Sequence, residues 1–150
     1  MNMAKNVLKL VYEQKQKQVT SALQTYKKAQ NILFEQRQQL QNLQQYRRQY
    51  TEQLSVKGAL GLSVSELRKY QQFIVQIDLG LSKQQQMLVK LEYDVHAYKK
   101  SWLECQINSK AIAMLLHKKA LKEEKIENIK EQKLLDEFTI FQYFQKRSQI

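Results

Sequence analysis

Apolar side chains recur at alternating intervals of three and four residues through the second half of the chain. From Leu67 to Leu116, thirteen of the fifteen positions in this series are apolar, and the polar ones are Gln84 and Ser109. The series is Leu67, Tyr70, Ile74, Ile77, Leu81, Gln84, Leu88, Leu91, Val95, Tyr98, Trp102, Cys105, Ser109, Ile112 and Leu116. A mean spacing of about 3.5 residues keeps one stripe, here called the seam, turned toward a single partner helix. The pattern predicts a long coiled-coil helix.

The same spacing runs through the first third of the chain and supplies the partner helix. Eleven of its fourteen seam positions are apolar, and the polar ones are Lys15, Gln36 and Arg47. The series is Leu8, Tyr12, Lys15, Val19, Ala22, Tyr26, Ala29, Leu33, Gln36, Leu40, Leu43, Arg47, Tyr50 and Leu54. Polar seam residues cost stability but fix the register of the pair.

Two glycines, Gly58 and Gly61, separate the two series, and glycine allows a backbone to reverse direction. Ser63 with Glu66 three residues later has the form of a capping box, which starts a helix. The sequence therefore predicts an all-α fold, a long two-helix antiparallel coiled coil over a single domain, residues 1–150. Helix one is expected at about 2–54, the tip at 55–63 and helix two at about 64–144, extending beyond helix one.

The end of the chain is expected to lack a partner helix. If the two helices pair around a tip at 55–63, Leu8 lies opposite Ser109. Helix one then ends before it can cover the residues after Leu116. Seven of the eleven residues from Leu134 to Phe144 are apolar or aromatic. Because exposed patches of this kind usually mark binding sites, this segment is a candidate partner-binding surface.

An aromatic group is predicted next to the tip. Tyr50 and Tyr70 are seam residues, whereas Tyr46 and Phe73 are each one position off the seam and are expected on the same side of the helix pair. Protein interfaces favour large aromatic side chains. Two interpretations remain: these rings bind a partner, or they only cover the seam.

The predicted tip carries four aliphatic side chains around its two glycines: Val56, Leu60, Leu62 and Val64. A hairpin tip in water has few ways to bury so many aliphatic groups. Either they pack on one another, or they contact another protein.

Composition and charge exclude several classes of protein. The chain has 24 glutamines, three glycines and no proline, and its net charge of +11 is spread along its length, which favours acidic partners without identifying them. No apolar stretch reaches the roughly 18 residues of a membrane span, and the first residues do not resemble a secretory signal. The sequence therefore predicts a cytoplasmic protein without direct membrane insertion.

Little in the sequence favours an enzyme. His96 and His117 have no second ligand at metal-binding spacing, and Cys105, a seam residue, has no histidine within one helical turn. There is no glycine-rich phosphate loop, and a two-helix rod offers no concave pocket. We expect no catalytic residue, no metal and no cofactor. The scattered lysines also match no nucleic-acid-binding module, so nucleic acid is not an expected partner.

Three segments resemble the flagellar export protein FliJ family in sequence, order and spacing. They are YRRQY from Tyr46, RKYQQFI from Arg68 and EQKLLDEFT from Glu131, and the resemblance covers nearly the whole chain. It implies an antiparallel coiled coil, similar to the central stalk subunit of rotary ATPases, in the flagellar type III export apparatus. The implied partners are the ring of the export ATPase (FliI), the cytoplasmic domain of the export gate protein FlhA, and export chaperones. The implied location is the cytoplasmic face of the inner membrane, at the flagellar basal body.

The resemblance also implies two contact regions. The residues expected to contact the gate are Gln39, Leu43, Tyr46, Tyr50, Phe73 and Ile77. Those expected to contact the ATPase ring are Leu8, Leu135, Asp136, Glu137 and Phe138. The competing hypothesis is an architectural coiled-coil adaptor unrelated to export.

Overall fold

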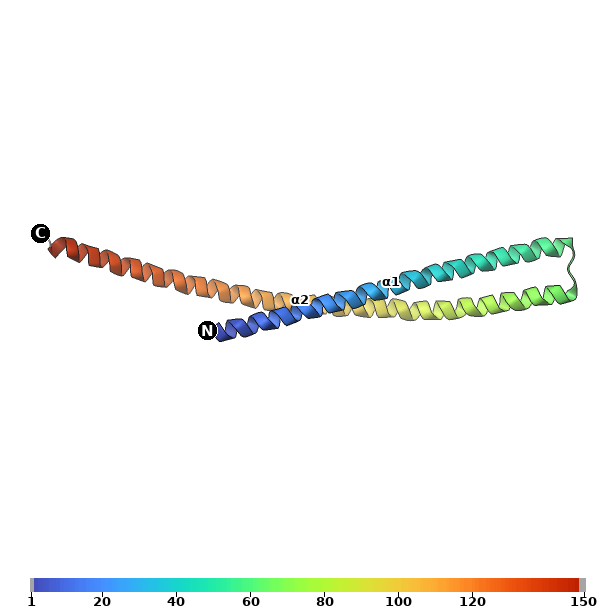
Figure 1. Cartoon of the computed structure of the whole chain (residues 1–150), viewed down its shortest axis with the longest axis horizontal. Helices are drawn as coiled ribbons and strands as arrows, with labels where there is room; N and C mark the ends of the chain where they lie inside the picture. Colours follow the sequence, from blue (N-terminus) through green and yellow to red (C-terminus); the bar gives the residue numbers. More distant parts are fainter. Residues whose placement is uncertain (1, 149–150) are drawn as a thin grey trace. The chain divides into compact units, whose positions relative to one another are not determined.

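The computed structural model describes residues 2–148, with side chains from residue 3 onward, as two α-helices (Figure 1). Helix α1 spans Asn2–Leu60 (59 residues) and helix α2 spans Val64–Ser148 (85 residues). The two helices pack against each other as a helical hairpin, and the described part of the chain contains no strand. The predicted all-α fold class is confirmed.

The chain divides into two compact units, each of which contains a part of both helices. One unit joins the chain up to Gln18 with the chain from Cys105 onward, and the other comprises Val19–Glu104. The expectation of a single domain stays a prediction.

Burial follows the predicted seam closely. All fourteen seam positions of α1 are at least partly buried, and so are thirteen of the fifteen in α2. The exceptions are Leu67, in the first turn of α2, and Tyr98, both of which are exposed. The most deeply buried residues are Ala29, Leu33, Ile77, Leu88 and Ser109, all of them seam residues. The alternating spacing in the sequence therefore identified the core.

The connection between the helices is shorter than predicted. Helix α1 continues through Gly58 to Leu60, more than one turn past the expected end at Leu54. The backbone reverses at Gly61, whose φ is +97° and whose N–H donates to the carbonyl oxygen of Gly58 at 3.3 Å. Ser63 caps α2 as predicted, because its Oγ accepts a hydrogen bond from the N–H of Glu66 at 3.2 Å.

The longer α1 changes the register of the pair. Ser109 lies opposite Gln16, whose Nε2 donates to Ser109 Oγ at 2.8 Å, and so it does not face Leu8. The expected register was therefore wrong by about two turns, because the tip had been taken to begin at residue 55. The pairing also extends past Leu116, since Lys5 Nζ donates to Glu123 Oε2 at 2.8 Å.

Polar seam residues within Val19–Glu104 find partners across the pair. Gln84 Nε2 donates to Gln36 Oε1 at 2.6 Å and to the Gln36 carbonyl oxygen at 3.2 Å. Arg47 Nε donates to Asp78 Oδ1 at 2.5 Å, and this hydrogen bond raises the pKa of the guanidinium. A shift of one helix along the other would leave these groups without their partners, so they fix the register.

Alanine substitutions of Gly58 and Gly61 are expected to have opposite effects on the stability of the chain. Gly61→Ala is expected to destabilise the chain by about 1–2 kcal/mol, because an alanine at φ of +97° is strained even though no atom lies near its Cβ. Gly58→Ala is expected to stabilise it by about 0.5–1 kcal/mol, because Gly58 is helical and its Cβ position is open. Urea unfolding followed by circular dichroism measures both. Equal effects of the two substitutions would contradict this assignment of the turn.

Candidate partner-binding surfaces

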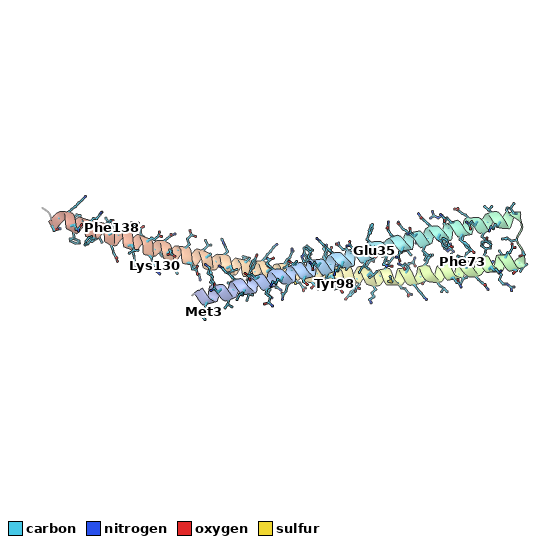
Figure 2. All side chains as sticks on the ribbon, viewed as in Figure 1. Met3, Glu35, Phe73, Tyr98, Lys130 and Phe138 are labelled. Carbon is cyan, nitrogen blue, oxygen red and sulfur yellow. The ribbon has the colours of Figure 1, made fainter. Side chains whose placement is uncertain are left out.

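Four aromatic rings form a continuous group near the connection, here called the aromatic cluster. It consists of Tyr46, Tyr50, Tyr70 and Phe73. The Tyr50 ring lies 4.7 Å from Phe73, 5.0 Å from Tyr70 and 6.4 Å from Tyr46, measured between ring centroids. Tyr46 meets Phe73 edge to face at 6.2 Å. Figure 2 shows Phe73 close to the connection between the helices. The structure therefore brings together the two off-seam aromatics that the sequence placed on one side.

The rings of the cluster differ in exposure. Tyr46 is 47% exposed, whereas Tyr50, Tyr70 and Phe73 are half-buried. Burial is the main reason that the pKa of Tyr50 is raised. Lys57 Nζ donates to the Tyr70 hydroxyl at 2.6 Å, and this bond is the main reason that the pKa of Lys57 is raised. The cluster thus covers the seam, and Tyr46 also presents an aromatic ring to solvent. Binding of a partner by these rings stays a prediction.

The other residues expected to contact the gate lie in different environments. Gln39 is exposed on α1, about two turns before Tyr46. Leu43 is half-buried and Ile77 is buried, as their seam positions predicted. A partner can therefore reach Tyr46, Phe73 and Gln39 directly, whereas Ile77 supports the helix pair beneath them.

The sequence interpretation missed the ion pair beside the cluster. Arg47 follows Tyr46 directly and bonds Asp78 through two nitrogens, with a second distance of 3.3 Å from Nη2 to Oδ2. A charged residue at a seam position was the available signal, because such a group needs a partner on the facing helix.

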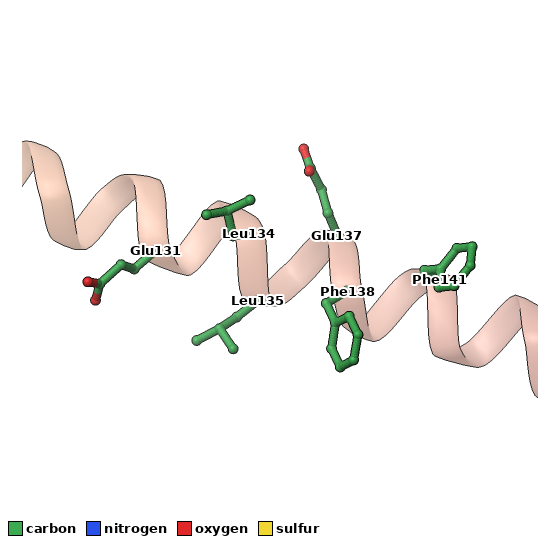
Figure 3. A pocket seen from close by; sticks show the side chains of 6 residues that line it. All are labelled: Glu131, Leu134, Leu135, Glu137, Phe138 and Phe141. Atoms are coloured by element: carbon green, nitrogen blue, oxygen red, sulfur yellow. The ribbon is translucent and has the colours of Figure 1, made fainter.

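The last turns of α2 form the second candidate surface, here called the C-terminal segment, residues 134–144. Its large apolar side chains are all exposed: Leu134, Leu135, Phe138, Ile140, Phe141, Tyr143 and Phe144. Figure 3 shows Leu135 and Phe138 projecting from one side of the helix and Leu134 and Glu137 from the other. The predicted exposure of this segment is confirmed.

Four of the residues expected to contact the ATPase are consecutive in this segment. Leu135, Asp136, Glu137 and Phe138 are all exposed, and Gln132 Nε2 donates weakly to Asp136 Oδ1 at 3.4 Å. The fifth, Leu8, is half-buried on the seam of α1. Leu8 is therefore less accessible than the four residues of the C-terminal segment.

The ion pair between Lys5 and Glu123 predicts a specific acid dependence. The hydrogen bond from Lys5 is the main reason that the pKa of Glu123 is lowered from its usual 4.5. A carboxylate whose pKa is lower in the folded state than in the unfolded state stabilises the fold at pH values above its usual pKa. This stabilisation is lost as the pH falls through the folded-state pKa. The unfolding midpoint of Glu123→Gln is therefore expected to fall less than that of the wild type when the pH is taken below 4.5. Thermal unfolding across a pH series measures this.

Glu124→Gln is the matched control, because Glu124 is the exposed neighbour of Glu123. It should retain the acid dependence of the wild type. Identical pH profiles for all three proteins would mean that the ion pair does not affect stability.

Among residues 2–148, no group of three or more His, Cys, Asp or Glu side chains is placed to hold a metal ion. Neither described helix contains a stretch long and apolar enough to cross a bilayer.

Comparison with known proteins identifies the family. Residues 4–148 match the protein family described as flagellar FliJ protein. A search of curated proteins and a search of solved structures each gave no match. Since the family match spans nearly the whole chain, the chain belongs to the flagellar FliJ family, which implies a role in flagellar protein export.

Proposed function

We propose that the chain is a non-enzymatic coupling component that bridges the export ATPase (FliI) ring and the cytoplasmic domain of the export gate protein FlhA. It works without a cofactor, in the cytoplasm at the inner membrane, and also assists in the handling of export chaperones. The observation that carries the proposal is the presence of two apolar surfaces that reach solvent on separate segments: the aromatic cluster, through Tyr46, and the C-terminal segment.

The aromatic cluster is the proposed gate contact. A few tyrosine, tryptophan and arginine side chains usually supply most of the binding energy of a protein interface. Tyr46 is exposed but held by ring contacts to Tyr50 and Phe73, so little side-chain freedom is lost when a partner binds. Gln39 extends the same surface along α1 with a polar side chain.

The C-terminal segment is the proposed ATPase contact. Successive residues of a helix are rotated by about 100°, which places Leu134 and Phe141 on one side and Ile140 and Tyr143 on the opposite side. A helix with apolar side chains on all sides is normally enclosed. A ring of ATPase subunits can enclose a single helix, whereas one flat partner covers only part of it.

ATP hydrolysis by the purified export ATPase, with and without this chain, tests the proposal. We expect stimulated turnover, together with co-sedimentation of the chain and the assembled ATPase. If neither is observed, the proposed ATPase contact, and with it the bridging role, is wrong.

A further inference from the structure

The connection between the helices exposes aliphatic side chains that nothing in the described chain covers. Leu60 is 83% exposed, Val64 is 74% exposed and Val56 is 63% exposed, while Leu62 between them is half-buried. Three of the four residues of this group, here called the hairpin tip, are therefore largely open to solvent, which argues against the interpretation that the four side chains bury one another. Figure 1 shows the short link between α1 and α2.

Positive charge surrounds the hairpin tip. Lys57, Arg68 and Lys69 lie within about two turns of the connection, and Glu66 is the one acidic residue between Gln53 and Ile77. The three ion pairs found among the described residues involve none of these cations. Lys57 bonds the neutral hydroxyl of Tyr70 and lies over its ring at 5.4 Å, and the negative charge of Glu66 only adds to the effect of Tyr70 in raising its pKa.

The chemistry of the hairpin tip fits a lipid surface better than a protein. Leucine and valine are under-represented among the residues that dominate protein interfaces, where tyrosine, tryptophan and arginine prevail. Peripheral membrane segments instead place aliphatic groups deepest, with tyrosine and basic side chains behind them at the level of the headgroups. The hairpin tip has this order, with Leu60 and Val64 foremost and Lys57 and Tyr70 behind them.

We propose that the hairpin tip docks on the surface of an anionic lipid bilayer. Leu60 and Val64 enter the boundary between headgroups and acyl chains, and Lys57, Arg68 and Lys69 face the lipid phosphates. The contact is shallow and needs no membrane-spanning helix, so it amends the sequence expectation of no membrane insertion, which rested on the lack of a long apolar run. It does not depend on the proposed gate and ATPase contacts.

Co-sedimentation of the full chain with vesicles tests this inference. The vesicles contain phosphatidylglycerol and phosphatidylcholine, or phosphatidylcholine alone. We expect the wild type to bind the anionic vesicles, and Leu60→Gln with Val64→Gln to weaken that binding by about tenfold or more, because two aliphatic side chains no longer leave water. Arg68→Gln with Lys69→Gln should weaken binding to the anionic vesicles only.

Leu79→Gln with Val89→Gln is the matched control, because both residues are exposed aliphatic side chains on α2 outside the hairpin tip. It should bind like the wild type, and helicity should be unchanged in every variant. Equal binding by the tip variant and the control would overturn the inference, since the contact would then come from net charge or from the C-terminal segment. The absence of vesicle binding by the wild type would also overturn it. The inference would likewise be overturned if the Leu60 and Val64 variant bound the vesicles like the wild type and lost binding to a protein partner only.

Discussion

Replacing Tyr46 and Phe73 together with alanine is expected to abolish binding to the cytoplasmic domain of the export gate and to stop motility. These rings contact each other edge to face, and Tyr46 is the exposed ring of the aromatic cluster while Phe73 is half-buried beside it. Removing a dominant interface residue usually costs about 2 kcal/mol or more, so losing both should cost about 4 kcal/mol and weaken binding by about a thousandfold. Calorimetric titration with the purified gate domain measures the affinity, and swarming of a complemented strain measures motility.

Tyr93→Ala with Val75→Ala provides the matched control for this substitution. Both residues are exposed on α2 outside the aromatic cluster, so the same number of apolar side chains is removed. Gate binding should be retained, and circular dichroism should show equal helicity for both variants. A large loss of helicity in the Tyr46 and Phe73 variant would mean that the pair is structural, and unchanged gate binding would refute the assigned contact.

The second large effect is expected from Leu135→Asp with Phe138→Asp, which should remove the stimulation of ATP hydrolysis. Both side chains are exposed and project from one side of the C-terminal segment (Figure 3). Two carboxylates buried without partners in an apolar contact carry a large desolvation cost. We therefore expect ATPase turnover with this variant to match turnover without the chain.

The same pair of substitutions at exposed positions elsewhere on α2, Leu79→Asp with Val89→Asp, is the control for this effect. That variant should stimulate hydrolysis as the wild type does. If the C-terminal variant stimulates equally well, the ATPase contact lies outside Leu135 and Phe138, and the proposed role of the C-terminal segment is wrong.

The sequence predicted the seam because a two-helix pair buries one stripe, and the spacing of that stripe is visible in the sequence. It did not predict the connection, because both glycines were taken as turn residues. Only Gly61 adopts positive φ, whereas Gly58 continues the helix. A glycine allows a reversal without requiring one, so the register, which depends on where the reversal falls, was also misplaced.

The candidate surfaces were predictable to different degrees. Exposure of the C-terminal segment was predicted because helix one is too short to face it. The partner of Arg47 could not be identified, because pairing with Asp78 depends on the register that the sequence misplaced. Exposure of the hairpin tip was equally undetermined, since it depends on how few residues form the connection.

The most direct test of the bridging role is retention of the export ATPase on an immobilised gate domain. The gate domain is incubated with the purified ATPase, with or without this chain. We predict that the ATPase is retained when the chain is present, and that both the Tyr46 and Phe73 variant and the Leu135 and Phe138 variant abolish this retention. Binding of each partner separately, but never of both together, would contradict the bridge.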